Sequence, residues 1–195
     1  MQNLKGLKIG YALTGSFCTF SESFKLIEKL LELNVEIFPI ISFNVQSIKN
    51  RFITPEKTLE FLESKTKNPI IKTIEQAESI GPKNFLDLLL VAPCTSNTLG
   101  KFANGINDTP VTMAMKSFLR SQNKPLVIAL SSNDSLGLTL KNIATLINTK
   151  NIYFSPMVQD DICKKPNSLV ANYSKIIDTM LNALNNNQIR PIITI

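Results

Sequence analysis

A short apolar run from Leu86 to Val91 constrains the fold of this chain more than any other segment. It reads Leu-Asp-Leu-Leu-Leu-Val, so an extended strand here would be apolar on both faces except at Asp87. Strands of that kind occur in parallel sheets that helices cover on each side. Pro93 and a group of small polar residues follow almost at once. The segment therefore predicts a central parallel strand whose carboxyl end opens onto a ligand site.

Apolar periodicity along the rest of the chain predicts strands that alternate with amphipathic helices. The expected strands span 7–13, 35–41, 86–91, 125–130 and 152–154, with a short one near 70–71. The expected helices contain the apolar sets 20–31, 59–62, 99–103, 140–147 and 176–184, together with the segments 73–80 and 111–121. This order predicts an α/β fold with a Rossmann-like, doubly wound parallel sheet of about six strands in three layers. No repeat or Gly/Ser-rich linker divides the chain, so we expect one domain over residues 1–195.

Individual residues predict where some of these strands and helices begin and end. Pro93 is expected to end its strand, because proline cannot donate to the ladder of hydrogen bonds. Thr19 followed by Glu22 is typical of a capping box, although the helix could also begin a turn earlier, near Ser16. Residues 42–51 are expected to form a loop.

The absence of histidine from all 195 residues narrows the chemistry of this chain. No histidine of the chain can act as general base, as partner of a nucleophile or as metal ligand. The three cysteines, Cys18, Cys94 and Cys163, form no CxxC pair, which argues against a zinc site and against a disulfide framework. We therefore expect no metal site and reduced thiols.

Charge is scattered along the chain, with 21 basic and 15 acidic residues and a net charge of +6. No block of Lys and Arg with interleaved aromatic residues marks a nucleic-acid surface, so no nucleic-acid partner is expected. The positive balance favours an anionic small molecule or an acidic protein partner. Neither a membrane span nor a signal peptide is expected, because Lys8 interrupts the apolar stretch near the start and no long apolar run follows. We expect a cytoplasmic protein.

Polar loops follow the expected strands, and parallel strands bring their carboxyl ends to one edge of the sheet. The loops are Thr14 to Ser16, Pro93 to Thr98 and Ser131 to Asp134, and Ser42 follows the second strand. The first loop lacks the GxGxxG pattern, so a complete dinucleotide site is not expected. A glycine flanked by hydroxyls before a helix suits a terminal phosphate, but the same three residues also form a common turn.

The second loop carries the more specific signal. A proline-ended strand with a helix cap needs one polar side chain, whereas small or polar residues occupy every position from Cys94 to Asn97. Cys94 itself is more simply interpreted as a small buried residue than as a nucleophile, because no histidine can activate its thiol.

Two further segments have alternative interpretations. Residues 131–134 could form part of the site, or Asn133 or Asp134 could simply cap a helix. Residues 157–161 contain the pair Asp160 and Asp161, and this segment could be a mobile lid or a solvated loop.

Four segments together resemble a known family. They are LTGSFCTF after the first strand, APCTSNTLGKFANGI after the Leu86 strand, LSSNDSLGL after the next, and NIYFSPMVQDDICKKPNSLVA near the end. Over nearly the whole chain they resemble the B subunits of dipicolinate synthases. Those proteins belong to a wider flavoprotein family that includes phosphopantothenoylcysteine decarboxylases, lantibiotic cysteine decarboxylases and flavin prenyltransferases. APCTSNT resembles the PASANT motif of that family, and TGS resembles its FMN phosphate loop.

The resemblance implies a flavodoxin-like flavoprotein fold with an FMN site. It implies that the phosphate would be bound by Gly15, Ser16 and Ser42. It also implies that Pro93, Thr95, Asn97 and Thr98 would lie beside the flavin ring or the substrate. With their loop neighbours, the candidate FMN-binding residues are Thr14, Gly15, Ser16, Ser42, Pro93, Cys94, Thr95, Asn97, Thr98 and Ser131. The candidates for a catalytic role are Asn97, Asn133 and Asp134.

The resemblance also implies an activity and partners. In that family the B subunit acts with an A subunit that resembles a nicotinamide-dependent dehydrogenase. Together they oxidise a dihydrodipicolinate-pathway intermediate to dipicolinate during sporulation. The chain would then be part of an oxidoreductase with a small dicarboxylate substrate, NADP on the A subunit, and a homo-oligomeric, trimer-based assembly.

Two departures from the wider family leave alternatives open. The cysteine decarboxylases use a histidine, and this chain has none. The family's PxMN segment is replaced by Ser131-Ser132-Asn133-Asp134, in which Asn133 could match the motif asparagine. The chain could therefore be a non-catalytic partner subunit with a flavoprotein fold. A stand-alone flavin-dependent decarboxylase or prenyltransferase is a further alternative.

Overall fold

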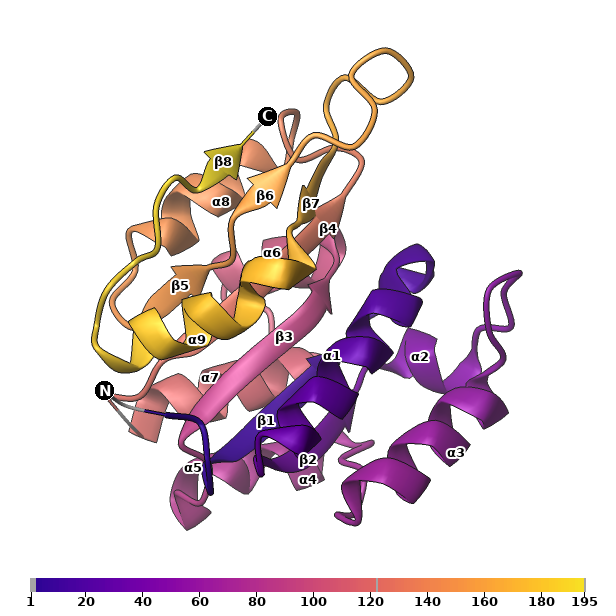
Figure 1. Ribbon diagram of the computed structural model, residues 1–195, viewed down its shortest axis with the longest axis vertical. Helices are drawn as coiled ribbons and strands as arrows, with labels where there is room; N and C mark the ends of the chain where they lie inside the picture. Colours follow the sequence, from indigo (N-terminus) through magenta and orange to yellow (C-terminus); the bar gives the residue numbers. More distant parts are fainter. Residues whose placement is uncertain (1–2, 122, 195) are drawn as a thin grey trace.

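The computed structural model describes residues 3–121 and 123–194 and is built around a twisted parallel sheet (Figure 1). Five strands form its parallel part: β1 (Lys8–Leu13), β2 (Glu36–Ile41), β3 (Leu88–Cys94), β4 (Leu126–Ser132) and β5 (Ile152–Phe154). Their order across the sheet is β2-β1-β3-β4-β5. Strand order therefore reverses at β1, where the chain crosses from β2 to β3.

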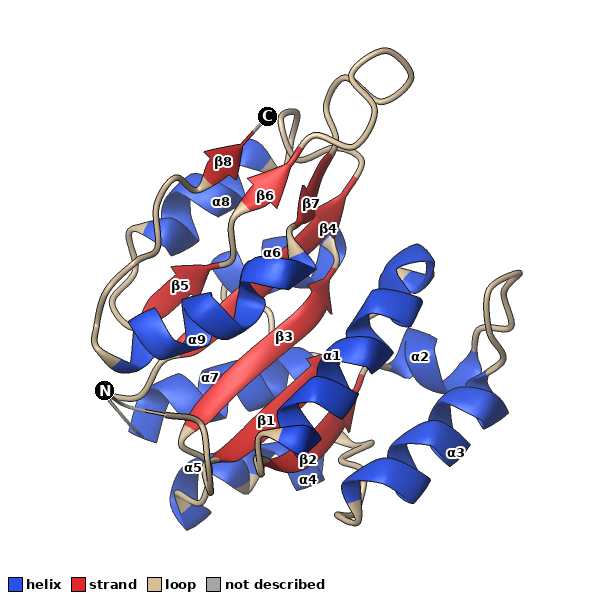
Figure 2. Ribbon diagram, viewed as in Figure 1, coloured by secondary structure: helices blue, strands red, loops and turns tan. Residues whose placement is uncertain are grey.

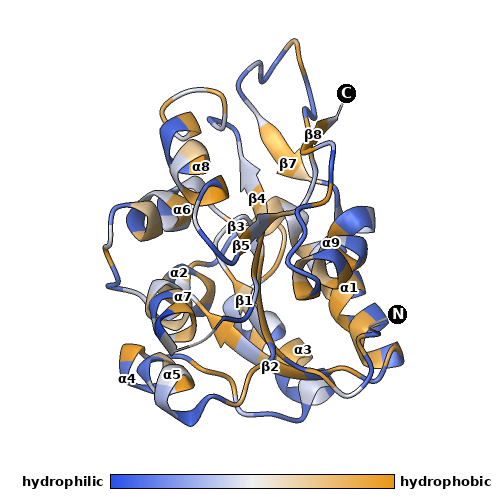
Figure 3. Ribbon diagram, turned by 90° about the vertical axis from the view of Figure 1, so that its left-hand side faces the viewer, coloured by the Kyte–Doolittle hydropathy of each residue, from blue (hydrophilic) through white to orange (hydrophobic). Residues whose placement is uncertain are grey.

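Helices cover both faces of the sheet (Figures 2 and 3). One face carries α1 (Phe20–Glu32), α3 (Pro55–Thr66) and α9 (Ile176–Leu184). The other carries α4 (Ile74–Glu78), α5 (Ile80–Lys83), α6 (Ser96–Ala103), α7 (Pro110–Ser121) and α8 (Leu140–Ile147). The three-layer arrangement expected from the sequence is confirmed. In the described part of the chain, no helix has the length and apolar character that crossing a bilayer requires.

Strand β3 separates the two hydrophobic cores. Leu88 and Leu90 pack in the core under α1 and α9, whereas Leu89 and Val91 pack in the core on the opposite face. Every residue of β3 is buried, as its continuous apolar sequence predicts for a central parallel strand. Packing on both faces therefore fixes the position of β3, the strand that leads into the polar loop at Thr95.

The sheet has eight strands in the described residues, not about six as expected. The additional strands are β6 (Met157–Val158), β7 (Leu169–Ala171) and β8 (Ile193–Thr194). They are too short to show a periodic pattern, and β7 runs antiparallel to the end of β4. The expected strand near 70–71 is only an isolated bridge between Ile40 and Ile71.

Three local expectations near the site were wrong. Pro93 does not end its strand: β3 continues to Cys94, with a cis Ala92–Pro93 peptide and a register shift against β4. Thr19 makes no capping box, because its hydroxyl donates to Ser16 O at 2.9 Å and the chain enters α1 through the 3-10 turn Phe17–Thr19. The expected loop at 42–51 begins with the short helix α2 (Phe43–Ser47).

Candidate functional site

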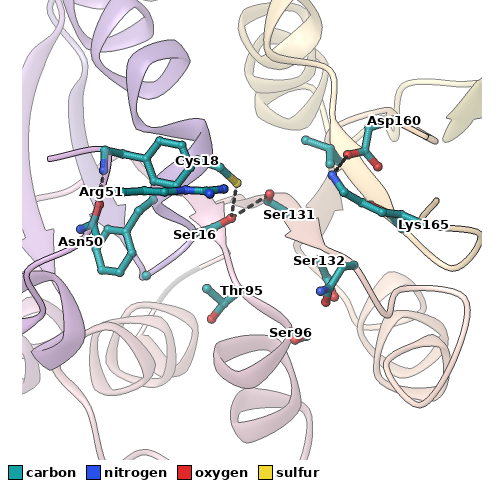
Figure 4. A pocket seen from close by; sticks show the side chains of 16 residues that line it. Ser16, Cys18, Asn50, Arg51, Thr95, Ser96, Ser131, Ser132, Asp160 and Lys165 are labelled. Carbon is teal, nitrogen blue, oxygen red and sulfur yellow. Dashed lines mark hydrogen bonds and ion pairs between the residues drawn. The ribbon is translucent and has the colours of Figure 1, made fainter.

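Two cavities lie at the carboxyl ends of the parallel strands. The larger cavity has a volume of about 480 Å³, and Ser16, Thr95 and Ser131 contribute to its walls (Figure 4). The smaller cavity measures about 210 Å³ and is lined by residues that include Ser42 and Asn97. Gly15 and Thr95 line both, so the two cavities are neighbours around the start of α6. The loops after β1, β2, β3 and β4 thus meet at one edge of the sheet.

Thr14 holds two of these loops together. Its hydroxyl donates to Pro93 O at 2.8 Å and accepts a hydrogen bond from Thr95 N at 2.9 Å. The residue is only 1% exposed and lines neither cavity. The hydroxyl proton is therefore not available to a phosphate, contrary to the expectation for Thr14, and the side chain instead positions the backbone of Gly15 and Thr95.

Ser16 and Ser131 connect the loop after β1 to the end of β4. Ser16 Oγ donates to Ser131 Oγ at 2.9 Å, and both residues line the larger cavity (Figure 4). Ser131 belongs to β4 and is paired with Val170 of β7, so its position is fixed by the sheet. These two hydroxyls form a fixed polar wall between the loops.

Ser42 contributes the one buried hydroxyl among the described residues of the site that has no hydrogen-bond partner. The residue is 7% exposed and lines the smaller cavity with Gly15 and Asn97. An unpaired buried polar group costs about 1–3 kcal/mol relative to a paired one. A ligand that offers a hydrogen-bond acceptor in the smaller cavity would remove that penalty.

Gly15 lies where the two cavities meet. A Cβ built on Gly15 would lie 3.4 Å from Asn44 Cβ and 3.6 Å from the Phe17 ring, which are ordinary contacts. The backbone at Gly15 does not require glycine, so a small side chain such as that of alanine would fit at this position.

The start of α6 presents polar groups to both cavities. The Thr95 hydroxyl caps the helix by accepting from Thr98 N at 3.2 Å, and it donates to Thr98 Oγ1 at 3.0 Å. The next two residues face different cavities. Ser96 lines the larger cavity, and Asn97 lines the smaller one. A helix N-terminus carries partial positive charge and free backbone N–H groups, so this edge favours an anion.

Pro93 and Cys94 lie behind the site and line neither cavity. Both are buried, and burial raises the pKa of the Cys94 thiol from its ordinary value to about 12. The thiol therefore stays protonated and cannot act as a nucleophile at neutral pH. This geometry agrees with the simpler interpretation of Cys94 as a small buried residue. It does not agree with the expectation that Cys94 contacts the cofactor.

Alkylation tests this placement of the cysteines. At about pH 8, iodoacetamide is expected to modify Cys18 and Cys163, which are exposed, and to leave Cys94 unmodified in the folded protein. Mass spectrometry of the labelled peptides measures the result, and unfolding in guanidinium should make Cys94 react as well. Equal labelling of Cys94 and Cys18 in the folded protein would show that the strand end is open.

The structure separates the two candidates in the loop after β4. Asn133 lines the larger cavity, but Asp134 lines neither cavity and its backbone N–H donates to Ser132 Oγ at 3.1 Å. Asp134 therefore cannot touch a ligand held in these cavities without movement of the loop.

Several residues that line the larger cavity are not among the candidate site residues predicted from the sequence. Arg51 comes from the loop between α2 and α3, and Asp160 and Lys165 come from the loop between β6 and β7 (Figure 4). Neither loop has a periodic pattern that would place it beside the strand ends. The acidic pair at 160–161 was one signal, because its segment does form a wall of the cavity.

The smaller cavity has charged groups of its own. Lys101 and Asp108 line it and form an ion pair of 2.8 Å. This pair lowers the pKa of Asp108, chiefly through its hydrogen bond to Lys101. In the described part of the chain, no group of His, Cys, Asp and Glu is arranged to hold a metal ion.

The match to a family model decides the family. The model described as "Flavoprotein" matches residues 1–185, which is nearly the whole chain. The chain belongs to the flavoprotein family. The dipicolinate synthase B subunit from Bacillus subtilis (strain 168) is 42% identical over 193 residues, covering 99% of this chain and 96% of the relative. A putative phosphopantothenoylcysteine decarboxylase from Dictyostelium discoideum is 30% identical over 175 residues, covering 83% of this chain and 81% of the relative.

Two solved structures show the same fold. The crystal structure of the dipicolinate synthase B subunit from Bacillus halodurans C has a TM-score of 0.90 and 39% identity, covering 100% of this chain and 99% of that one. An FMN-dependent cysteine decarboxylase has a TM-score of 0.67 at 19% identity, covering 92% of this chain and 98% of that one. The second match shows the fold alone.

The residues at the strand ends fit the phosphate end of a flavin mononucleotide. Ser42 offers an unpaired buried hydroxyl, Gly15 lines the same cavity without a side chain, and the first turn of α6 adds backbone N–H groups. A phosphate supplies the acceptor oxygens that such a donor set lacks. The donor set of the smaller cavity thus fits the cofactor that the flavoprotein family implies.

Proposed function

We propose that this chain is the flavin-binding B subunit of a dipicolinate synthase. It would act with a dehydrogenase-like A subunit to oxidise a dihydrodipicolinate-pathway intermediate to dipicolinate during sporulation. The similarity to B subunits along almost the whole chain supports this function. The observation that carries the proposal is the pair of neighbouring cavities at Gly15 and Thr95, one suited to a phosphate and one large enough for a small substrate.

FMN would be held by residues of both cavities. Gly15, Ser42 and the first turn of α6 would bind the phosphate, and Thr95 and Asn97 would lie beside the rest of the cofactor. Bound FMN would supply a site that accepts and returns electrons. The chain's part is to bind and orient it, because neither Cys94 nor a histidine is available for acid–base chemistry.

The substrate would occupy the larger cavity. Ser16 and Ser131 supply hydroxyls on one wall, and Asn133 supplies an amide group on another. Aromatisation of the dihydropyridine ring removes one hydride and one proton, and we place the final hydride acceptor, NADP, on the A subunit. The proton would leave to solvent, because the larger cavity opens to it through the exposed side chains of Asn133 and Arg51.

The proposal includes the assembly. The resemblance to flavoproteins implies FMN at protomer boundaries, and we propose a trimer-based homo-oligomer of this single-domain chain, in complex with the A subunit. Light scattering of the purified chain measures this directly.

Reconstitution tests the function. Mixing this chain with the A subunit, NADP and dihydrodipicolinate is expected to form dipicolinate faster than the A subunit alone. Dipicolinate is followed by its ultraviolet absorption. Asn97→Ala and Ser16→Ala are expected to reduce the rate, whereas Lys29→Gln, on an exposed position that lines neither cavity, serves as control. A rate equal to that of the A subunit alone would contradict the proposal.

A non-catalytic partner subunit is the second candidate, and one observation favours it. Asp160, the one carboxylate among the described residues that line the larger cavity, is paired with Lys165 at 2.7 Å, and this hydrogen bond lowers the pKa of Asp160. Under this alternative the chain would hold substrate or stabilise the A subunit without a flavin. Dipicolinate formation that needs this chain but no FMN would support it.

A further inference from the structure

Two cations lie on opposite sides of the Ser16–Ser131 pair in the larger cavity (Figure 4). Arg51 comes from the loop before α3, and Lys165 comes from the loop before β7. Among the described residues that line this cavity, the only carboxylate is that of Asp160. The cavity therefore has two positive groups separated by neutral hydroxyls, a distribution suited to a ligand with two negative ends.

The loop that carries Arg51 is fixed, and the Arg51 guanidinium has no carboxylate partner among the described residues. Asn50 Oδ1 accepts hydrogen bonds from Phe52 N at 2.9 Å and Ile53 N at 3.1 Å, which fixes the turn around Arg51. The guanidinium carbon lies 4.8 Å from the centre of the Phe52 ring, in a cation–π contact. Arg51 forms no ion pair with any acidic residue in the described part of the chain. Its planar fork of N–H donors is thus free for a carboxylate, the group that it binds in bidentate geometry.

Lys165 is also held by its loop, but it has an internal partner. Its backbone N–H donates to Asp161 O at 2.8 Å, and Ser168 N donates to Lys165 O at 3.0 Å, so both ends of the turn are fixed. Its ammonium forms a 2.7 Å ion pair with Asp160. An ammonium has three N–H donors, so this contact leaves two for another acceptor.

We propose that Arg51 and Lys165 each bind one carboxylate of a small planar dicarboxylate in the larger cavity, an assignment that rests on the proposed function. Asp160 pairs with the ammonium of Lys165 and also repels the carboxylate that approaches it. Ser16 and Ser131 lie between the two charges and contact the middle of the ligand. This arrangement distinguishes a dicarboxylate from a monocarboxylate, because only the former uses both cations.

Removing either cation should weaken binding of a dicarboxylate. A hydrogen bond to a charged group contributes enough that its loss corresponds to about a tenfold weaker affinity or more. Arg51→Gln and Lys165→Gln are therefore expected to raise the Kd for dipicolinate about tenfold each, with little change for picolinate, which has one carboxylate. In wild type, dipicolinate should bind more tightly than picolinate, and each variant should reduce that preference.

Calorimetric titration of the purified chain with dipicolinate and with picolinate measures these effects. Lys29→Gln is the matched control, because it lowers the net charge by the same amount at an exposed position that does not line the cavity. Asp160→Asn separates binding from loop structure: it is expected to keep or increase the affinity, because it removes a negative charge beside the ligand. A Kd in Arg51→Gln and Lys165→Gln equal to that of Lys29→Gln would overturn the assignment. An Asp160→Asn variant as weak as Lys165→Gln would also overturn it, because the ion pair would then only shape the loop.

The reconstituted complex separates this inference from the proposed function. If the complex forms dipicolinate and the two variants leave the KM for dihydrodipicolinate unchanged, the assignment fails and the proposed function stands. If the isolated chain binds dipicolinate through both cations but the complex forms none, the dicarboxylate site stands and the proposed function fails. If the chain binds neither acid and the complex is inactive, both are overturned.

Discussion

Replacing Gly15 by aspartate is expected to lower the affinity for FMN by at least about 100-fold. Gly15 lines both cavities, and we place the phosphate beside it. A carboxylate about 4 Å from a phosphate repels it by roughly 4 kcal/mol at the effective dielectric of a protein surface. A loss of that size corresponds to more than about a 100-fold change in Kd. Fluorescence titration with FMN measures it.

Folding should tolerate the Gly15 substitutions. The contacts that a Cβ would make, at 3.4 Å and 3.6 Å, need little adjustment. Gly15→Ala adds the same Cβ without charge and is expected to keep FMN binding within a few-fold of wild type and the melting temperature nearly unchanged. If the Gly15→Asp variant binds FMN as tightly as the Gly15→Ala variant does, the phosphate lies elsewhere.

Replacing Thr14 by valine is expected to destabilise the protein by about 2 kcal/mol. The change preserves the shape of the side chain but removes the hydroxyl that links Pro93 O to Thr95 N. Thr14 N still donates to Pro93 O at 3.2 Å, so the principal loss is the partner of Thr95 N. Urea unfolding measures the free energy. Because the hydroxyl positions the start of α6, FMN binding should weaken as well.

A second buried threonine provides the control for that prediction. Thr66 is 5% exposed, and its hydroxyl donates to Leu62 O within the same helix at 2.8 Å. Thr66→Val should cost less than Thr14→Val, because it breaks no link between separate loops. Thr14→Ser should restore much of the stability. Equal destabilisation by Thr14→Val and Thr66→Val would show that the bridge between the loops contributes nothing specific.

The meeting of the polar loops could be predicted because the topology requires it. Continuous apolar strands such as β3 are parallel and buried, and parallel strands place their carboxyl ends on one edge. The contacts between Thr14 and Thr95 and between Ser16 and Ser131 follow from that arrangement. The hydrogen bonds that these hydroxyls make within the protein could not be predicted, because a sequence does not show which polar groups bond to one another.

The charged walls of the larger cavity depend on tertiary structure. Asn50 fixes the loop that carries Arg51, and a turn at Asp161 after the short strand β6 fixes the loop that carries Lys165. These loops lack the apolar periodicity on which sequence-based prediction depends. The strands β6, β7 and β8 were missed for the same reason, since each has only two or three residues.

The visible absorption spectrum of the purified chain, after incubation with FMN and removal of free ligand, tests the central claim most directly. We predict a retained flavin band for wild type and Gly15→Ala and its loss from Gly15→Asp. A wild-type chain that retains no flavin, while dipicolinate still raises its melting temperature, would contradict the claim. The cavities would then form a substrate site, and the oxidation would belong to the A subunit.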